Sequence, residues 1–471
     1  MNSTFNLDKG VKEALTKEEQ RSNFRRATTT LRANSTKIFN PEEKEQMRRN
    51  VEYSKKKVLA NLPDLLERFE EKCKENGIIV HWARDAEDAK SITLNIAKKH
   101  NVKKIVKGKS MISEEIHLNP FLQEQGIQVV ETDLGEFIIQ LNGEPPSHII
   151  VPAVHKNRYE IGRIFENELK VPYTDDVQEL NAIARKSLRE HFATADMGIS
   201  GVNFAIANSG AILLVENEGN GRMCTTVPKV HVAFMGLERI VESFDDIPAC
   251  LRLLTGSATG QLITTYVNII TGTRKQNEKD GPSEVHVIIV DNGRSAIYAN
   301  EKFRSTLQCI RCGACLNNCP VYINIGGHAY QSVYPGPIGE ILTTQLEGIE
   351  AKGELVSASS LCQSCSEVCP ALIPIAQTIR NLREERVNKH GVVKGAGSKS
   401  SKLEAFSWKA WSWMNRSPRA YYLLLSFLTT FGFMIPKVSL LKQWTKGRAK
   451  PRFASKSLHS LVKKEDGVRY E

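Results

Sequence analysis

Between about residues 77 and 293, short apolar runs rich in β-branched residues alternate with longer amphipathic stretches. Short apolar runs predict β-strands, and apolar positions three or four residues apart predict helices. The predicted strands are 78–82, 104–106, 128–131, 148–151, 211–216, 230–235 and 285–290, and the predicted helices are 87–100, 176–193 and 240–253. This alternation indicates an α/β domain with a mostly parallel sheet, whose ligand-binding loops lie at the carboxyl ends of the strands.

One loop of this domain combines acids, glycines, an arginine and two threonines directly after the clearest strand, 211–216. Its candidate ligand-binding residues are Glu216, Glu218, Gly219, Gly221, Arg222, Thr225 and Thr226. Such a turn can present backbone N–H groups and a cation to an anion. The glycines equally suit a structural connection that needs positive φ angles, so both interpretations stay open. The loop has neither a G-x-G-x-x-G fingerprint nor a P-loop.

Two cysteine runs follow the α/β domain. The first run is Cys309, Cys312, Cys315 and Cys319, followed by Pro320. Its C-x2-C-x2-C-x3-C-P spacing is that of bacterial-type ferredoxins, which hold 4Fe–4S clusters and use the fourth cysteine for the neighbouring cluster. The second run is Cys362, Cys365 and Cys369, followed by Pro370. Zinc sites use isolated C-x2-C pairs with four closed ligands, which is a different pattern.

The cross-ligation rule assigns the seven cysteines to two clusters. The first cluster takes Cys309, Cys312, Cys315 and Cys369, and the second takes Cys319, Cys362 and Cys365. The second set lacks one thiolate, so that cluster is either a 4Fe–4S cluster with a non-thiolate ligand or open iron, or a 3Fe–4S cluster. Ser359 stands where the missing cysteine would be, and it is either an oxygen ligand or an ordinary structural serine.

Composition indicates the cellular compartment and the character of the two ends of the chain. The N-terminus has no apolar signal segment, which together with cysteines in metal spacing predicts a reducing cytoplasm. Three further cysteines, Cys73, Cys224 and Cys250, are expected to be packing residues. The formal net charge of +11 comes from residues 391–471, which hold 16 Lys+Arg against 4 Asp+Glu and four of the five tryptophans.

These patterns predict four parts. They are an N-terminal helical arm (1–70), the α/β domain (71–298), an α-helical ferredoxin-like domain with two clusters (299–390) and a helical, basic, aromatic tail (391–471). The apolar stretch 421–435 is shorter than the roughly 20 residues of a spanning helix, so it docks against protein or lies in a membrane interface. A nucleic-acid partner is not expected, because the basic charge is confined to a tail without a binding fold.

The order of these parts resembles the lactate-utilisation protein B family, also called YkgF-like. The resemblance rests on residues 203–210 (NFAIANSG), 215–222 (VENEGNGR), 228–231 (PKVH) and 361–370 (LCQSCSEVCP), and it covers about residues 10 to 465. In that family the second run also has three cysteines. The resemblance implies a LUD domain with an isomerase/CoA-transferase-like fold. It also implies a three-component system that oxidises L-lactate to pyruvate for growth on lactate. The implied partners are a CCG-type cysteine-rich subunit and a LUD-only subunit.

The residues alone predict a two-cluster electron-transfer protein, and they include no Ser-His-Asp, HExxH or paired-carboxylate site. We therefore expect an electron-transfer subunit of an L-lactate-oxidising complex rather than its catalytic subunit alone. An iron–sulfur redox sensor and an assembly scaffold without a role in turnover are the alternatives. The expected location is the cytoplasm, with a membrane-associated electron acceptor and peripheral attachment to the inner face of the membrane as a further option.

Overall fold

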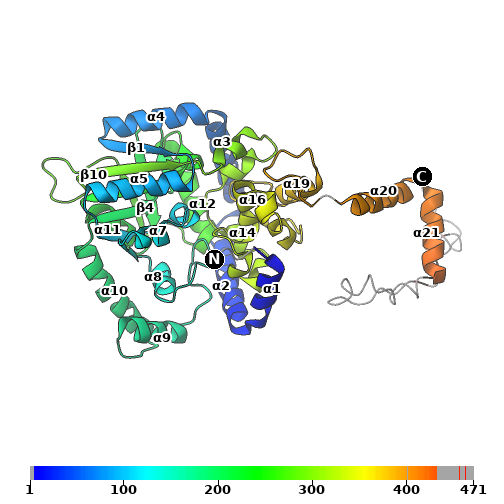
Figure 1. The fold of residues 1–471 in the computed structure, drawn as a ribbon, viewed down its shortest axis with the longest axis horizontal. Helices are drawn as coiled ribbons and strands as arrows, with labels where there is room; N and C mark the ends of the chain where they lie inside the picture. The colour runs from blue at the N-terminus through cyan, green and yellow to red at the C-terminus, as the bar shows by residue number, and fades with distance from the viewer. Residues whose placement is uncertain (1–4, 400, 432–453, 455, 457–461, 463–471) are drawn as a thin grey trace. The chain divides into compact units, whose positions relative to one another are not determined.

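The computed structural model describes residues 5–399, 401–431, 454, 456 and 462 (Figure 1). The chain divides into two compact units, residues 1–398 and 399–471. Within the first unit, one buried cluster combines Phe24 of the N-terminal arm, Phe204 of the α/β region and Cys315 of the first cysteine run. The finer domain limits at residues 70 and 298 stay predictions.

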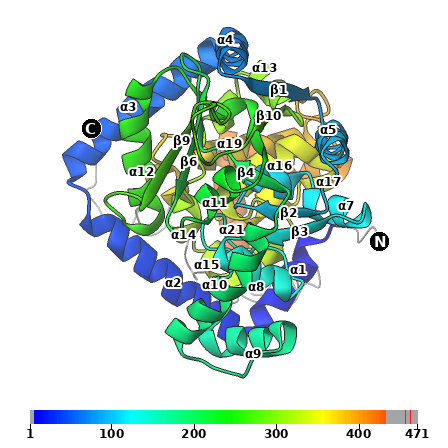
Figure 2. The same cartoon turned by 90° about the vertical axis from the view of Figure 1, so that its left-hand side faces the viewer.

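Six parallel strands form the main sheet, in the order β1-β10-β7-β4-β2-β3 (Figure 2). They are β1 (Ile78–Ala83), β2 (Lys104–Lys107), β3 (Gln128–Glu131), β4 (Met197–Gly201), β7 (Val230–Gly236) and β10 (Glu284–Val290). Separate apolar clusters fill the two faces of the sheet, and every residue of β7 is buried. Burial on both faces explains the nearly continuous apolar runs, and the prediction of a mostly parallel α/β domain is confirmed.

A second, mixed sheet has the order β8-β5-β6-β9. Its strands are β5 (Phe204–Ile206), β6 (Ala211–Glu216), β8 (Ile240–Val241) and β9 (Tyr266–Ile270). β6 runs antiparallel to both β5 and β9, whereas β5 and β8 are parallel. The predicted ligand loop therefore follows an interior strand of this smaller sheet, since β6 lies between β5 and β9.

Helices connect and cover the two sheets. Those of the α/β region are α5 (Ala86–Lys99), α6 (Met111–Glu115), α7 (Leu118–Glu124), α8 (Leu134–Leu141), α9 (Arg158–Leu169), α10 (Val177–Ala193), α11 (Asn220–Thr226), α12 (Ile247–Thr259) and α13 (Arg294–Ala299). α5 and α7 cover one face of the main sheet, where Ala89, Ile96 and Leu122 meet Ile105 and Phe234. α5 and α10 confirm two of the predicted helices.

Four helices form the N-terminal part of the chain, and the last of them passes the predicted limit of the arm at residue 70. They are α1 (Leu7–Thr16), α2 (Glu18–Lys37), α3 (Pro41–Ala60) and α4 (Leu62–Glu75). The Asn40 side chain caps α3 by accepting a hydrogen bond from Glu42 N at 2.9 Å, and Pro41 is pre-set for the first helical position. α4 lies beside β1 (Figure 2), and its Phe69 is fully buried in the apolar cluster on the second face of the main sheet, with residues of β7 and β10.

Two predicted elements are wrong. Residues 148–151 form no strand, because His148 Nδ1 accepts hydrogen bonds from Ile150 N at 2.9 Å and Val151 N at 3.2 Å. These bonds occupy the N–H groups that a strand would need. The helix predicted over 240–253 begins only at Ile247, since the first residues form β8 and a capping box of Ser243 and Asp246 follows. Strands β4, β5 and β9 were not predicted.

The cysteine region consists of short helices. They are η3 (Arg304–Gln308), α14 (Ala314–Asn317), α15 (Tyr322–Ile325), η4 (His328–Tyr330), α16 (Gly336–Glu347), α17 (Ile349–Lys352), η5 (Leu355–Ala358), α18 (Ser364–Glu367) and α19 (Ile375–Val387). α16 is the central one, with ten of its twelve residues buried. The expectation of a helical iron–sulfur region is confirmed.

The second unit contains the helices α20 (Lys402–Arg416) and α21 (Pro418–Phe431), and neither has a buried residue. The predicted helical tail is confirmed over this part. The apolar stretch 421–435 is helical as far as Phe431, and its last four residues lie outside the described residues. Among the residues that the structure describes, no helix has the length and apolar character to cross a membrane.

Candidate functional site

The first cysteine run turns through two residues with left-handed backbone conformation. Arg311 has φ 61° and Gly313 has φ 73°, on either side of Cys312. Cys315 lies within α14, and Cys319 follows its end. A Cβ atom at Gly313 would lie 3.1 Å from Ile150 Cγ1 and 3.2 Å from His148 Cε1, so this position needs glycine for its φ angle and its close approach to the 148–151 loop.

The second run repeats the same local fold. Leu361 has φ 57° and Gln363 has φ 70°, on either side of Cys362, and α18 then contains Cys365. A 3₁₀ helix precedes each run, η3 before the first and η5 before the second. The two runs are therefore structural repeats as well as sequence repeats.

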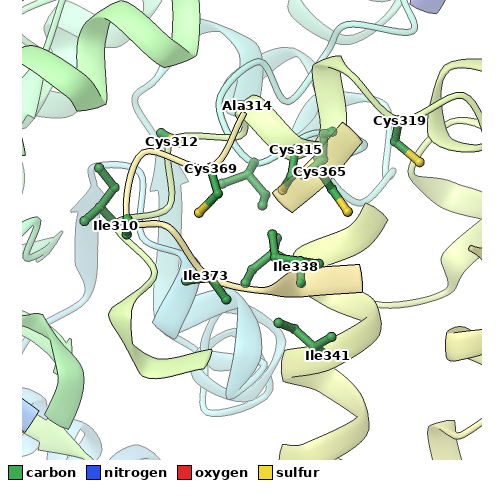
Figure 3. Close-up of a cluster of buried hydrophobic side chains, with 14 of the residues drawn as sticks. Ile310, Cys312, Ala314, Cys315, Cys319, Ile338, Ile341, Cys365, Cys369 and Ile373 are labelled. Atoms are coloured by element: carbon green, nitrogen blue, oxygen red, sulfur yellow. The ribbon is translucent and has the colours of Figure 1, made fainter. Parts of the chain in front are cut away.

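The structure brings cysteines of the two runs together. Cys309, Cys312 and Cys315 of the first run line one cavity with Cys369 of the second. In the second group, burial raises the pKa of Cys365 and of Cys319 most, and smaller contributions come from Cys362 to Cys365 and from Cys365 to Cys319. Figure 3 shows Cys315 and Cys365 between the Cys312–Cys369 pair and Cys319. This grouping is compatible with the predicted ligand sets, which stay predictions.

The thiols fit an iron–sulfur group electrostatically. All ten cysteines of the chain are free thiols. Burial is the largest effect on the pKa of Cys369 and Cys365, raised to about 11, and on that of Cys319, raised to about 12. Backbone N–H groups point at the sulfurs, with Arg311 N 3.4 Å from Cys309 Sγ and Tyr322 N 3.4 Å from Cys319 Sγ. Buried thiols with N–H donors become thiolates once metal supplies the compensating charge.

A buried ion network connects the first run to the main sheet. The fully buried Glu238 carboxylate accepts from Arg294 Nε at 2.8 Å and from Arg311 Nη2 at 3.1 Å. Arg294 also pairs with Glu115 at 2.7 Å, and Tyr334 Oη donates to the same carboxylate at 2.7 Å. Burial opposes ionisation of Glu238, but the arginines outweigh it and lower its pKa to about 2. The network fixes the orientation of Arg311 within the cysteine run.

A cavity of about 400 Å³ lies at the carboxyl ends of the parallel strands, as the sheet type predicts. Gly108 after β2 and Ser200 in β4 form part of its wall. Its charged lining residues are Lys109, Asp133, Glu216, Glu218, Arg239 and Arg311. Arg311 also lines the cysteine cavity, so this residue borders both spaces.

The predicted ligand loop forms only part of this wall. Glu216, Glu218 and Gly221 line the cavity, but the Glu216 carboxylate itself accepts from Gly221 N at 2.6 Å and Arg222 N at 2.7 Å. The backbone donors offered to an anion are therefore occupied by the protein's own carboxylate. Gly219 has φ 81° and is the N-cap residue of α11. The remaining predicted residues lie outside the cavity lining, with Arg222 exposed and the Thr225 and Thr226 hydroxyls donating to Arg222 O.

Sequence reasoning missed the cavity's cations. Arg311 could have been found, because it stands inside the first cysteine run. Lys109 and Arg239 gave no signal, since each follows a strand without a recognisable motif. His148 was also missed: its Nε2 lies 3.1 Å from Asn317 Oδ1 of α14, and burial lowers its pKa to about 4, so it is a neutral support behind the cysteine run.

Comparisons with known families match three parts of the chain. The LUD domain matches residues 66–290, the 4Fe-4S dicluster domain matches residues 305–373, and "Lactate utilisation protein B, C-terminal" matches residues 381–466. A crystal structure of a DUF162 family protein from Deinococcus radiodurans covers 49% of this chain and 98% of that chain. Its TM-score of 0.28 and 15% identity are too low to carry an argument.

Full-length relatives give the same family. Lactate utilization protein B of Oceanobacillus iheyensis is 45% identical over 389 residues, covering 83% of this chain and 78% of the relative. Lactate utilization protein B of Bacillus subtilis is 47% identical over 348 residues, covering 74% and 72%. The "uncharacterized electron transport protein YkgF" of Escherichia coli K12 is 42% identical over 414 residues, covering 86% and 85%. The chain belongs to the lactate utilisation protein B family, with a LUD domain followed by a 4Fe–4S region.

Proposed function

We propose that this chain is the iron–sulfur electron-transfer component of a multi-subunit system that oxidises L-lactate to pyruvate. Its relatives' names indicate lactate utilisation and electron transport, and its matched 4Fe-4S region supplies the type of cofactor. The observation that carries the proposal is the meeting of cysteines from two repeated runs, since Cys369 of one run lines the same cavity as three cysteines of the other. Single-cluster or zinc chemistry would not need this exchange.

The protein's residues would hold two clusters at different depths. The cavity for the first cluster is lined by buried Cys312, Cys315 and Cys369, whereas Cys362 of the second group is exposed. When bound, the clusters supply one-electron transfer, and oxidation of L-lactate to pyruvate releases two electrons and two protons. The first group of cysteines borders the LUD cavity, because Arg311 lines both cavities. The exposed Cys362 gives the second group a side that faces solvent or a partner.

The proposed partners are a CCG-type cysteine-rich subunit, a LUD-only subunit and a membrane-associated electron acceptor. The tail is the proposed contact region, because α20 and α21 expose large side chains such as Trp408 (63% exposed), Trp413 (66%) and Leu423 (67%) among basic residues. Aromatic and basic residues in one segment suit docking against a protein or an interface. Lactate growth would depend on this assembly.

Anaerobic reconstitution tests the proposal. The full chain is mixed with the two partner subunits, and cluster reduction is followed by electron paramagnetic resonance (EPR) after adding L-lactate. We expect L-lactate to reduce the clusters only with the partners present, and an added quinone analogue to reoxidise them. Clusters that never change oxidation state during lactate turnover would favour a scaffold. Cluster loss on oxidation, with a change of binding partner, would favour a redox sensor.

A further inference from the structure

Two buried guanidinium groups at the LUD cavity have N–H groups that make no hydrogen bond to the described residues. Arg239 is 8% exposed, lines the cavity and makes no hydrogen bond or ion pair with any described residue. Arg311 is 5% exposed, and only its Nη2 is paired, while Nε and Nη1 have no partner among the described residues. Buried guanidinium N–H groups without acceptors are costly, and an anion in the cavity would supply the missing acceptors.

The rest of the cavity suits a small hydroxy acid. Carboxylates bind guanidinium groups through two parallel hydrogen bonds, and two arginines line this cavity. Glu218 and Asp133 also line the cavity, and their carboxyl oxygens can accept a hydrogen bond from a hydroxyl. Met111 and Leu214 add apolar surface. Its size, about 400 Å³, falls in the usual range for small-molecule sites.

We propose that this cavity binds a small 2-hydroxy or 2-oxo carboxylate, with its carboxylate on Arg239 and Arg311 and its hydroxyl or keto group toward Glu218. The anionic site rests on the structure alone, and the choice of 2-hydroxy acids rests on the proposed function. The cluster and the ligand would share a cation, because Arg311 lines both cavities. Reduction of the first cluster should therefore weaken binding of the anion, and a bound anion should make that reduction less favourable.

This opposition predicts the direction in which a bound anion shifts the reduction potential of the first cluster. Coupling between two sites is reciprocal, so an anion that binds the oxidised protein more tightly lowers the reduction potential of the first cluster. The second cluster, farther from Arg311, should keep its potential. An EPR-monitored redox titration of the full iron-loaded chain, with and without L-lactate or pyruvate, measures both potentials in one experiment.

Calorimetry with the matched variants Arg239→Gln and Arg185→Gln tests the site directly. Arg185 is exposed on α10 and does not line the cavity. We expect pyruvate and L-lactate to bind wild type and Arg185→Gln equally, and Arg239→Gln at least about tenfold more weakly with unchanged iron content. Equal binding by Arg239→Gln overturns the site. Binding of inorganic phosphate but of neither carboxylate overturns the ligand class.

The proposed function can be judged separately from this inference. Neither carboxylate binds if the arginines serve only to balance the cluster's charge, and Arg239→Gln then changes the cluster potential alone. In that case lactate-dependent reduction by the partner subunits would persist in wild type, so the electron-transfer proposal would stand while the cavity inference fell. Absence of both binding and partner-dependent reduction would overturn both.

A different observation, the structural repeat of the two cysteine runs, points to a candidate for the fourth ligand of the second cluster. The two runs fold alike, and Ser359 takes the place of Cys309, one residue after its 3₁₀ helix. Leu361 N donates to Ser359 Oγ at 3.1 Å, as Arg311 N lies 3.4 Å from Cys309 Sγ. Arg383 Nη2 donates to Ser359 O at 2.5 Å and holds this backbone in place.

We propose that Ser359 Oγ lies at the fourth corner of the second cluster, in the place of the missing thiolate. A second oxygen donor competes for this role: Glu340 of α16 is fully buried, both of its carboxylate oxygens lack partners among the described residues, and it affects the pKa of Cys319 and Cys365. The repeat favours Ser359, because its backbone is already in the ligand conformation.

A Ser359→Cys variant tests this placement, with Ser360→Cys as the neighbouring control. Ser360 is exposed and has no counterpart among the ligands of the first run. We expect Ser359→Cys to change the EPR signal of the second cluster only and its introduced thiol to resist alkylation while the cluster is bound. Ser360→Cys should keep the wild-type signal and be alkylated. Free alkylation of both introduced thiols, or a changed signal only in Glu340→Gln, overturns the assignment.

Discussion

Replacing Arg294 by methionine removes the centre of the buried ion network that joins the main sheet to the first cysteine run. Arg294 is fully buried and donates to Glu238 at 2.8 Å and to both oxygens of Glu115 at 2.8 and 2.7 Å. Methionine keeps much of the side-chain volume but no charge. Glu238 retains Arg311, whereas Glu115 loses its cation.

The expected loss follows from what remains around Glu115. Breaking a buried ion pair by removing one partner costs about 3–5 kcal/mol. Asn292 and Tyr334 still donate to Glu115 at 2.7 Å each, so we expect a loss near the lower limit, about 3 kcal/mol. Burial raises the pKa of Glu115, and Arg294 outweighs it in wild type so that the pKa is lowered. Without Arg294 the pKa rises, so the deficit is largest at neutral pH and shrinks as pH falls through the carboxyl's ordinary range.

Anaerobic urea unfolding of the full iron-loaded chain measures this loss through the midpoint of the fluorescence transition. Midpoints are compared at equal iron content, because a chain with bound clusters does not unfold in two states. Arg84→Met is the matched control, since Arg84 is 84% exposed and pairs only on the surface with Asp88. An Arg294→Met midpoint equal to that of Arg84→Met at neutral pH would refute the reasoning.

Four further predictions address the clusters, the cavity and the tail. Gly313→Ala should lose about 1–2 kcal/mol of stability and part of the first cluster's iron, because its φ of 73° is strained for alanine; unchanged iron content and melting would contradict this. Cys369→Ala should remove the first cluster's EPR signal and Cys319→Ala the second's, although each cysteine belongs to the other run; the reverse pattern would exclude cross-ligation. Burial and then Asp133 raise the pKa of Glu218 to about 7, with Lys109 lowering it and Glu216 raising it. Carboxylate affinity measured by calorimetry should therefore fall as pH rises through 7, when Glu218 gains its charge, and Glu218→Gln should remove that step. Deleting residues 399–471 should keep both clusters but abolish turnover with the partner subunits, and full turnover by the truncated chain would rule out docking through the tail.

The main sheet could be predicted where strands are continuous apolar runs, and not where glycine interrupts them. β4 contains Gly198 and Gly201, which weaken a strand signal. Gly198 is needed there because an added Cβ would lie 1.8 Å from Cys224 O in α11. The strand predicted at 148–151 was wrong for the opposite reason. Its β-branched residues fit a strand, but the His148 ring accepts hydrogen bonds from the N–H groups of Ile150 and Val151.

The candidate site, too, could be predicted only where it depends on residues that are close in the sequence. Cysteine spacing is a local property, so both runs and the prediction of a 4Fe–4S region followed from the sequence. The ion network is not local: Arg294 meets Glu115 across 179 positions and Glu238 across 56. Likewise, Glu216 lies five positions from the N–H group it occupies, and nothing in the loop's composition distinguishes this use from an anion site. Only the folded chain shows which carboxylates and cations are already paired.

The measurement that tests the account most directly is the content of iron and acid-labile sulfide in anaerobically purified protein, together with EPR before and after reduction. Two clusters predict about eight sulfides per chain, with about eight irons for a 4Fe–4S second cluster or about seven for a 3Fe–4S one. A 3Fe–4S cluster would give a signal in the oxidised state, and a 4Fe–4S cluster only after reduction. About four sulfides per chain, or zinc in place of iron, would contradict the two-cluster account.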